Sequence, residues 1–403
     1  MSNDPLADVV SAQYEAWVYP EPIHDLPAWL EHNWQWFDPI HAHGLFWPDR
    51  PYPSGLRILV AGCGANQAAV LAATNPTAHV VGIDVSPTSL AHHERLARDN
   101  DLDNLELHRL PIEQVGTLGR EFDLVVSTGV LHHLADPQAG ADALASVLAR
   151  DGVLALMLYA HFGRIGVEIL ESVFADLGLR QDEASVAMVT SALGTLAAEH
   201  PVRPYMAIAP DLAFDGGIVD TFLHGRQRSY TVPDCLELVE RAGLVFQDWL
   251  FTESYEPPYG SQSVFHAAIA GRPDVQRWSI MERLNTVNAC HFFFACRPER
   301  DPSTYRVDLH GPSFRDLIPG LRAHCWRDGA DLVKPGGRRT LSATQQAIVD
   351  QIDGRRSIGA IVTNLAIVPG PAQLSTPDRE SVVRQTLAML VHNDFVQLAL
   401  PTT

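Results

Sequence analysis

The stretches ILVAGCGANQ (58–67) and HVVGID (79–84) decide the fold of this 403-residue chain. An apolar run of strand length ends at Ala61, and two glycines, Gly62 and Gly64, follow it closely. Glycines directly after a strand let the backbone turn tightly and approach a ligand without a clash at a Cβ atom. The N–H groups that open the next helix then face that ligand. The pattern predicts a ligand-binding turn between a strand and a helix.

The alternation of strands and helices continues along the chain. Strand-like runs occur at 56–61, 79–84, 105–110, 122–128 and 153–159, with helix-like stretches at 66–74, 87–100 and 137–149 between them. Short apolar strands separated by helices of this length predict right-handed βαβ units and a buried parallel sheet. Two further strands are expected at 246–251 and 288–297, after a helix at 232–243. The predicted fold class is α/β: a Rossmann-like, seven-stranded, doubly wound sheet.

Three regions are expected along the chain. Residues 1–54 form an arm rich in aromatic residues, in which 26–38 has the apolar spacing of an amphipathic helix. Residues 55–300 hold the sheet, with a helical insertion at about 161–232. Residues 301–403 form a small, α-rich domain whose segment LSATQQAIVDQIDGRRSIGAIV weakly resembles the winged-helix peptide-recognition domains of ribosomal-peptide modifying enzymes. A dimerisation or lid domain is the simpler interpretation of that region.

Composition excludes several classes of protein. The formal net charge is −19, and Lys334 is the only lysine, which disfavours a nucleic-acid substrate. No apolar run reaches the roughly 18 residues of a membrane span. The five cysteines lack a CxxC pair, so free thiols are expected, with neither a disulfide framework nor a zinc site. The N-terminus lacks the pattern of an export signal, which favours a cytoplasmic location.

Asp84 ends the second strand, 22 residues after Gly62. A carboxylate at this place can accept both hydroxyls of an adenosine ribose. The competing role, a cap for the following helix, is better served by Ser86. Leu110–Ile112 and Thr128–Val130 follow the next two strands, and the carboxyl ends of parallel strands line one ligand crevice.

Over residues 56–160 these motifs resemble the class I S-adenosylmethionine-dependent methyltransferases. The continuations YAHFGRIGVEILE (159–171), DTFLHGRQRSYTVPDCLELVERAGL (220–244) and HFFFACRPER (291–300) resemble a bacterial subgroup of them. The resemblance implies S-adenosyl-L-methionine as cofactor and methyl transfer to a small-molecule, carrier-bound or peptide acceptor. The cofactor-binding residues that it implies are Ala61, Gly62, Cys63, Gly64, Asn66, Gln67, Ile83, Asp84, Val85, Leu110, Pro111, Ile112, Thr128, Gly129 and Val130.

Two positions depart from the family pattern. Val60 stands where the family often has an acidic residue, so one anchor for the methionine ammonium is missing. Gln67, or Tyr14 and Tyr19 from the arm, are the expected substitutes. Asn66 stands in place of a third glycine and is expected to keep the turn, because asparagine tolerates a left-handed backbone.

Methyl transfer from a sulfonium depends mainly on the alignment of the acceptor with the methyl group, so no universal catalytic residue is expected. A general base helps only if the acceptor must lose a proton. His132, His133 and His224 are the candidate catalytic residues, and packing and capping are their competing roles. Asp220 and Arg228 are expected near His224 at an acceptor pocket. The paired histidines lack a third ligand at metal spacing, so no metal is predicted. No N/D-P-P-[YF] tetrapeptide follows the fourth strand, which disfavours methylation of nucleobases or glutamine amides.

Two alternatives stay open. One is a non-catalytic or peptide-recognition protein that binds S-adenosylmethionine. The other is an NAD-type oxidoreductase with the same turn and acid, although GxGxxG is incomplete and no YxxxK pair exists in a chain with one lysine. The expected partners are a methyl acceptor and a second copy in a homodimer, with no membrane.

Overall fold

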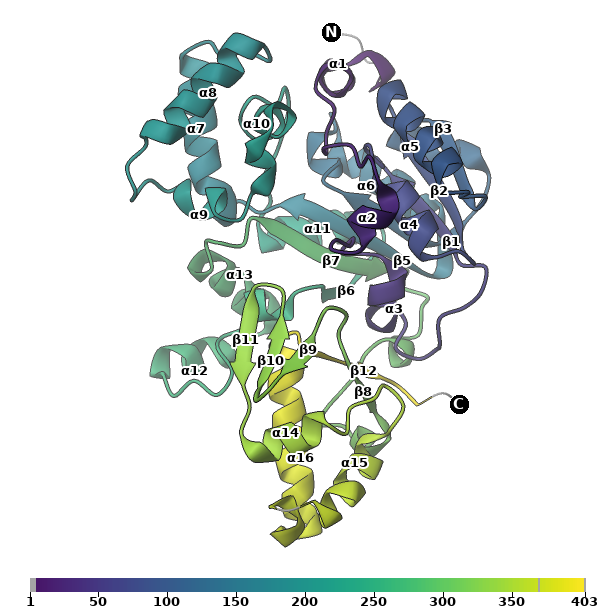
Figure 1. Ribbon diagram of the computed structural model, residues 1–403, viewed down its shortest axis with the longest axis vertical. Coiled ribbons are helices and arrows are strands. Elements are labelled where there is room, and N and C mark those ends of the chain that lie inside the picture. Colours follow the sequence, from purple (N-terminus) through teal and green to yellow (C-terminus); the bar gives the residue numbers. More distant parts are fainter. Residues whose placement is uncertain (1–4, 369, 402–403) are drawn as a thin grey trace. The chain divides into compact units, whose positions relative to one another are not determined.

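The computed structural model describes residues 5–368 and 370–401 (Figure 1). Residues 1–4, 369 and 402–403, which the predicted arm and C-terminal domain include, lie outside the described residues. The chain forms two compact units, each built from three segments. Unit 1 holds Met1–Gln35, Ser54–Trp249 and Asp274–Glu299, and unit 2 holds Trp36–Pro53, Leu250–Pro273 and Arg300–Thr403.

Unit 1 contains the predicted seven-stranded sheet, in the order β3-β2-β1-β4-β5-β7-β6. The strands are β1 (Arg57–Ala61), β2 (His79–Asp84), β3 (Leu105–Arg109), β4 (Phe122–Thr128), β5 (Leu148–Tyr159), β6 (Val245–Trp249) and β7 (Cys290–Cys296). β1 to β5 pair in parallel, and β7 runs antiparallel to both β5 and β6. The α/β fold class is therefore confirmed.

Helices follow the strands as the apolar spacing predicts. They are α4 (Gln67–Thr74), α5 (Pro87–Asp99), α6 (Pro137–Ser146), α11 (Val232–Arg241) and α13 (Asp274–Leu284). β1 is buried after its first residue, because its apolar side chains face helices on both sides of a parallel sheet.

The prediction of one helix over 26–38 is wrong. Only α2 (Leu26–Leu30) forms there, and the chain leaves the helix after Leu30. Asp38 then accepts a hydrogen bond from the N–H of Ile40 and begins α3 (Pro39–Phe46), with proline in its first turn. Local capping at Asp38 therefore starts a new helix where apolar spacing suggested one continuous helix.

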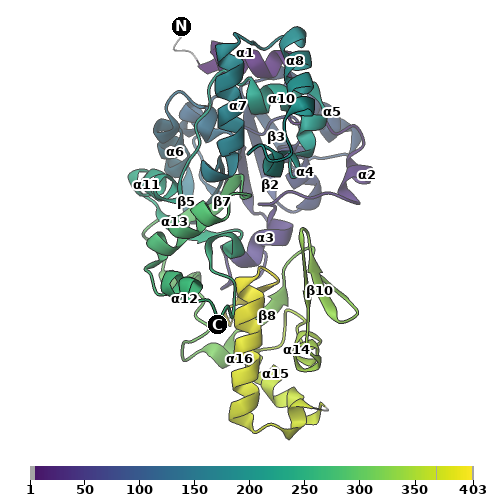
Figure 2. The same ribbon diagram turned by 90° about the vertical axis from the view of Figure 1, so that its left-hand side faces the viewer.

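The insertion after β5 is helical, as predicted. It contains α7 (Ile165–Asp176), α8 (Glu183–Thr195), α9 (Arg203–Met206) and α10 (Asp215–Phe222). Figure 2 shows α7, α8 and α10 gathered together, and they bury a common apolar core that includes Val167, Val189 and Val219. The insertion lies in unit 1, together with α1 (Val9–Ala16) of the arm.

Unit 2 combines helices with two small sheets. Its helices are α3, α12 (Val264–Ala270), α14 (Ala343–Val349), α15 (Ile358–Asn364) and α16 (Thr376–His392). Its strands are β8 (Ile318–Leu321), β9 (Trp326–Asp328), β10 (Asp331–Lys334), β11 (Gly337–Thr340) and β12 (Val396–Ala399). β8 pairs with β12, and β9 to β11 form an antiparallel sheet. Among the described residues, no helix has the length and apolar character needed to cross a membrane.

Candidate functional site

The turn after β1 has the conformation that its glycines predict. Gly62 and Gly64 have φ values of 73° and 55°, in the left-handed region that favours glycine. A Cβ atom on Gly62 would lie 2.5 Å from Cγ2 of Val130, which follows β4. Any other residue at position 62 would therefore be strained and would clash.

Asp84 lies against this turn. Its carboxylate accepts hydrogen bonds from the N–H of Gly64 (2.8 Å) and from the N–H of Ser86 (2.9 Å), one on each oxygen. Ser86, not Asp84, caps α5, because its hydroxyl accepts from the N–H of Ser89. Removal of the carboxyl group from water raises the pKa of Asp84 to about 6, although the hydrogen bonds from Ser86 and Gly64 favour its charged form.

The other predicted cofactor residues lie at the carboxyl ends of four neighbouring parallel strands, β3-β2-β1-β4. They differ in what they can offer a ligand. Ala61 and Ile83 are fully buried, whereas Val85 and Leu110 keep exposed surface. Only the second pair therefore presents side-chain surface in this structure.

Asn66 has a different role from the one expected. Its φ is −134°, so it does not use the left-handed conformation. Its side-chain oxygen accepts a hydrogen bond from the N–H of Ile23 (2.9 Å), and its amide nitrogen donates to the carbonyl of Glu21 (2.8 Å). Asparagine at this position therefore fastens the arm to the glycine turn.

The arm lies over the turn. A Cβ atom on Gly64 would lie 3.0 Å from Cδ of Pro20 and 3.4 Å from the carbonyl oxygen of Tyr19. Gln67, a predicted substitute for the missing acid, donates through its amide to the Thr128 hydroxyl (3.1 Å) at the end of β4.

Tyr14 of the arm reaches a buried carboxylate of the insertion. Its hydroxyl donates to Asp220 (2.9 Å), and the hydroxyl of Tyr159, at the end of β5, donates to the other oxygen of Asp220 (2.9 Å). Burial raises the pKa of both tyrosines well above the usual value, so they remain donors. Tyr19 similarly donates to Asp211 (2.9 Å). The sequence gives no signal for Asp211.

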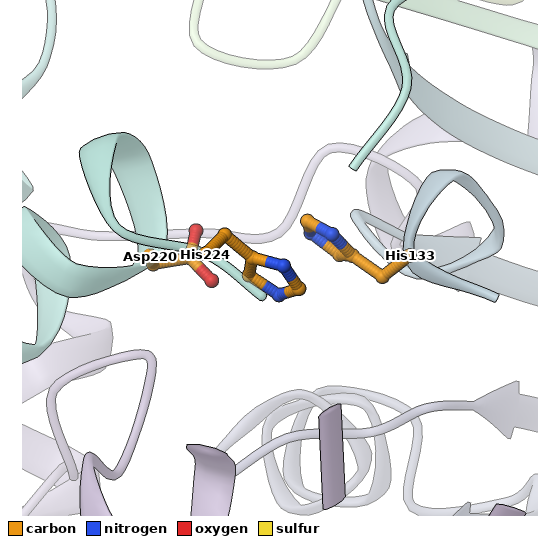
Figure 3. Close-up of side chains that lie close together, drawn as sticks. All are labelled: His133, Asp220 and His224. Atoms are coloured by element: carbon orange, nitrogen blue, oxygen red, sulfur yellow. The ribbon is translucent and has the colours of Figure 1, made fainter. Parts of the chain in front are cut away.

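The three candidate histidines meet at this place. The rings of His133 and His224 are stacked, with centroids 3.8 Å apart and an angle of 19° between their planes. Figure 3 shows the two rings turned toward one another, with the Asp220 carboxylate beside His224. His132 stacks on the ring of Tyr159 at 3.8 Å.

Hydrogen bonds fix the protons of these rings. Nδ1 of His133 lies 3.0 Å from the carbonyl oxygen of Arg226 and must donate to it, which leaves an unshared pair on Nε2. Nδ1 of His224 accepts from the N–H of Arg226 (3.0 Å), so Nε2 of His224 carries the proton. Burial lowers the pKa of His133 and of His224 to about 3, so both rings are neutral at pH 7.

Asp220 supplies the third ligand-type group that sequence spacing did not show. One ligand atom each of His133, Asp220 and His224 lies within 4.8 Å of the others. A metal ion, however, must lie in the plane of each imidazole that binds it. Two stacked, nearly parallel rings cannot direct their unshared pairs at one ion, and Nε2 of His224 carries a proton. The arrangement therefore fits a hydrogen-bonded cluster better than a metal site.

Arg164 is a buried cation that sequence reasoning missed. Its guanidinium lies 3.6 Å from the ring centroid of Tyr159, the last residue of β5, and the same ring packs against His132. Nη1 of Arg164 donates to the Tyr205 hydroxyl (2.9 Å). Arg228, which was expected near His224, donates its N–H to the carbonyl of His132 (3.0 Å), and its guanidinium pairs with Asp234 (3.6 Å). Arg164 comes five residues after the end of β5, and this position is the only feature of the sequence that could have indicated it.

Comparison with known proteins agrees with this geometry. The family model described as "Methyltransferase domain" matches residues 59–154. The chain is 31% identical over 365 residues to an uncharacterized protein of Synechococcus sp. The alignment covers 87% of this chain and 86% of the relative. The fold is similar to that of PKMT2 from Rickettsia typhi, with a TM-score of 0.66 and 14% identity over 94% of this chain and 77% of that chain. PKMT2 has also been solved in complex with AdoHcy, and that structure superposes with the same TM-score at 13% identity over 91% and 76% of the two chains.

The chain belongs to the class I S-adenosylmethionine-dependent methyltransferases, in one family with the Synechococcus protein. Its cofactor is S-adenosylmethionine. Two features fit this cofactor. The turn at Gly62–Gly64 has no room for a Cβ atom, so the backbone itself can approach a ligand, and the carboxylate of Asp84 is already oriented. No part of this comparison supports the oxidoreductase alternative.

Proposed function

We propose that this enzyme transfers the methyl group of S-adenosylmethionine to a small-molecule, carrier-bound or peptide acceptor at the ends of β1 to β5. The hydrogen bond of 2.8 Å between Gly64 N–H and Asp84 carries the proposal, because it brings the glycine turn and the acid together. The carboxylate keeps further unshared pairs, with which it accepts the two ribose hydroxyls.

The other residues of the site have simpler tasks. Val85, Leu110, Pro111 and Ile112 provide an apolar wall for the adenine ring, and the backbone of Gly62 to Gly64 lies against the methionine part. Tyr14 and Tyr19 close the site from the arm, where Pro20 already packs on Gly64.

The bound cofactor supplies a methyl group on a positively charged sulfur, which is already activated for displacement. The chain's own contribution is to align the acceptor and to exclude water. His133 and His224 are the candidates for contact with the acceptor, because both come next to the buried Asp220 carboxylate. His132 is a positioning residue, since its Nδ1 accepts from the N–H of Tyr159 (3.3 Å) and its ring packs on that tyrosine.

Calorimetry with S-adenosylhomocysteine tests the proposal. We expect binding by the wild type and about 100-fold weaker binding by Asp84→Ala, because two charge-assisted hydrogen bonds are lost. Asp99→Ala is the matched control, since Asp99 is an exposed acid at the end of α5. A wild-type chain that is folded and does not bind S-adenosylhomocysteine would refute the proposal.

A further inference from the structure

We propose that His133 and Asp220 bind the amino group of the methyl acceptor, so that the enzyme methylates an amine nitrogen. This inference rests on the proposed function and adds the chemical class of the substrate.

The first observation is an unused acceptor on His133. Its exposed fraction is 2%, and Nε2 is buried without a hydrogen-bond partner. The Nδ1–H bond to the carbonyl of Arg226 keeps the proton on the other nitrogen, so the unshared pair of Nε2 is free to accept. A buried acceptor without a donor is destabilising, and an N–H group of a ligand would remove that loss.

The second observation is a buried carboxylate that forms no ion pair with a described residue. Asp220 is 2% exposed, and its two oxygens accept only from the neutral hydroxyls of Tyr14 and Tyr159. Within the part of the chain that the structure describes, no arginine, lysine or histidine forms an ion pair with Asp220. Buried carboxylates are normally paired with a positive group, so this site favours a ligand that is or becomes cationic.

The two acceptors together select the ligand chemistry. One ring nitrogen each of His133 and His224 and one oxygen of Asp220 lie within 4.8 Å of one another, so a small group at this cluster is within reach of His133 and Asp220. A primary amine has two N–H donors and keeps one unshared pair for the methyl group. An alcohol or thiol has one donor and satisfies one acceptor only. A carboxylate or phosphate has no donor and is repelled by Asp220.

The transfer balances with the amine entering in its neutral form. Its nitrogen pair forms the new N–C bond while the S–C bond breaks, and the electron pair of that bond stays on sulfur. The positive charge passes from sulfur to nitrogen, where the Asp220 carboxylate stabilises it. The product leaves as an alkylammonium ion and loses its proton to solvent. Tyr14, which covers Asp220 from the arm, is the group whose movement admits the acceptor.

The first test locates the transferred methyl group. The full chain, with isotopically methylated cofactor, is incubated with cell extract that is either untreated or treated with acetic anhydride to block primary amines. We expect label on nitrogen in the untreated extract and its loss after blocking. Label on oxygen, sulfur or carbon, label that survives blocking, or no label from a chain that binds S-adenosylhomocysteine would overturn the inference. Failure to bind S-adenosylhomocysteine would instead refute the proposed function.

The second test separates acceptor binding from cofactor binding. We expect Asp220→Asn to lower the transfer rate by about 100-fold and to keep the affinity for S-adenosylhomocysteine within about threefold. Asp215→Asn, at an exposed position of the same helix α10, is the matched control. If Asp220→Asn does not fold, His133→Asn serves, because asparagine can still donate to the Arg226 carbonyl but lacks the Nε2 acceptor. Unchanged transfer by the folded variant would overturn the inference.

Discussion

In the proposed site, Asp84 accepts the ribose hydroxyls more strongly when it is charged than when it is protonated. Its carboxyl group sits between the N–H groups of Gly64 and Ser86, so its orientation is set before a ligand binds. The same burial that protects these bonds raises its pKa to about 6, close to the pH at which enzymes work. Cofactor binding should therefore depend on pH at this single residue.

We expect the affinity for S-adenosylhomocysteine to be constant above about pH 7 and to fall as the pH drops through 6. The raised pKa means that Asp84 takes up its proton in this range, and each pH unit below it costs up to about tenfold in affinity. Calorimetry between pH 5 and 8 measures the profile. Asp84→Asn should bind weakly and without this dependence, and an equal dependence in that variant would assign it to another group.

Gly62→Ala should destabilise the protein more than Gly55→Ala. Both glycines have a positive φ, 73° and 77°, so both variants carry a backbone cost of about 1 kcal/mol. A Cβ atom at Gly55 meets nothing within 4 Å, whereas one at Gly62 meets Val130, which adds about 1–3 kcal/mol of overpacking. Urea unfolding of the two variants measures the difference, and equal losses would show that Val130 moves aside freely.

Among the elements, the arm joins parts of unit 1 that are far apart in sequence. Glu15 of α1 accepts from the hydroxyls of Ser86 (2.6 Å) and Thr88 (3.0 Å) at the start of α5. Tyr14, one residue earlier, bonds to Asp220 of the insertion. The arm therefore contacts both α5 and the insertion, and the side chain of Asn66 adds two hydrogen bonds that hold the arm to the glycine turn.

Asn66→Ala should loosen the arm. It leaves the buried N–H of Ile23 without its partner, at a cost of about 1–3 kcal/mol, and it removes the donor to the Glu21 carbonyl, which water can partly replace. We expect faster amide exchange at residues 19–24 and weaker binding of S-adenosylhomocysteine. Asn66→Asp keeps the acceptor for Ile23 and should show a smaller effect on both. Unchanged exchange in Asn66→Ala would mean that other contacts hold the arm.

At the scale of the whole molecule, neither unit is continuous in sequence. In unit 2, α3 packs against β12, and the N–H of Leu400 donates to the carbonyl of Pro48 (2.7 Å). Asp394, which pairs with Arg322 at 2.8 Å, accepts from the N–H groups of Thr252 and Glu253 (both 3.1 Å). The predicted boundaries at 54/55 and 300/301 assign these associated segments to different regions of the chain.

A fragment of residues 301–403 should not unfold cooperatively by itself. It lacks α3 and residues 250–273, so Asp394 loses two donors and β12 loses the helix that covers it. Circular dichroism melting of the fragment beside the full chain measures this. A sharp transition of the fragment would show that its own core, which includes Leu387 and Leu390, is sufficient.

The sequence predicted the parts of the structure that local rules control. Strand ends, glycine turns and the cap at Ser86 depend on neighbouring residues, so the sheet, the turn at Gly62 and Gly64 and the capping role of Ser86 were predicted. The hydrogen bond from Gly64 to Asp84 was not. The role of Asn66, by contrast, depends on a contact with Ile23, 43 residues away. Asp220 was placed near His224, but its tyrosine partners come from the arm and from β5, and no periodicity shows such contacts. The hairpins of β9 to β11 were missed because their strands are three or four residues long.

The interleaving of unit 2 also sets an order for its assembly during protein synthesis. Residues 36–53 leave the ribosome early, yet their partners in β12 and at Leu400 are made some 350 residues later. Helix α3 therefore lacks its contact with β12 while the sheet of unit 1 is made. Nascent chains stopped before residue 396 should accordingly depend on chaperones more than the full-length chain does.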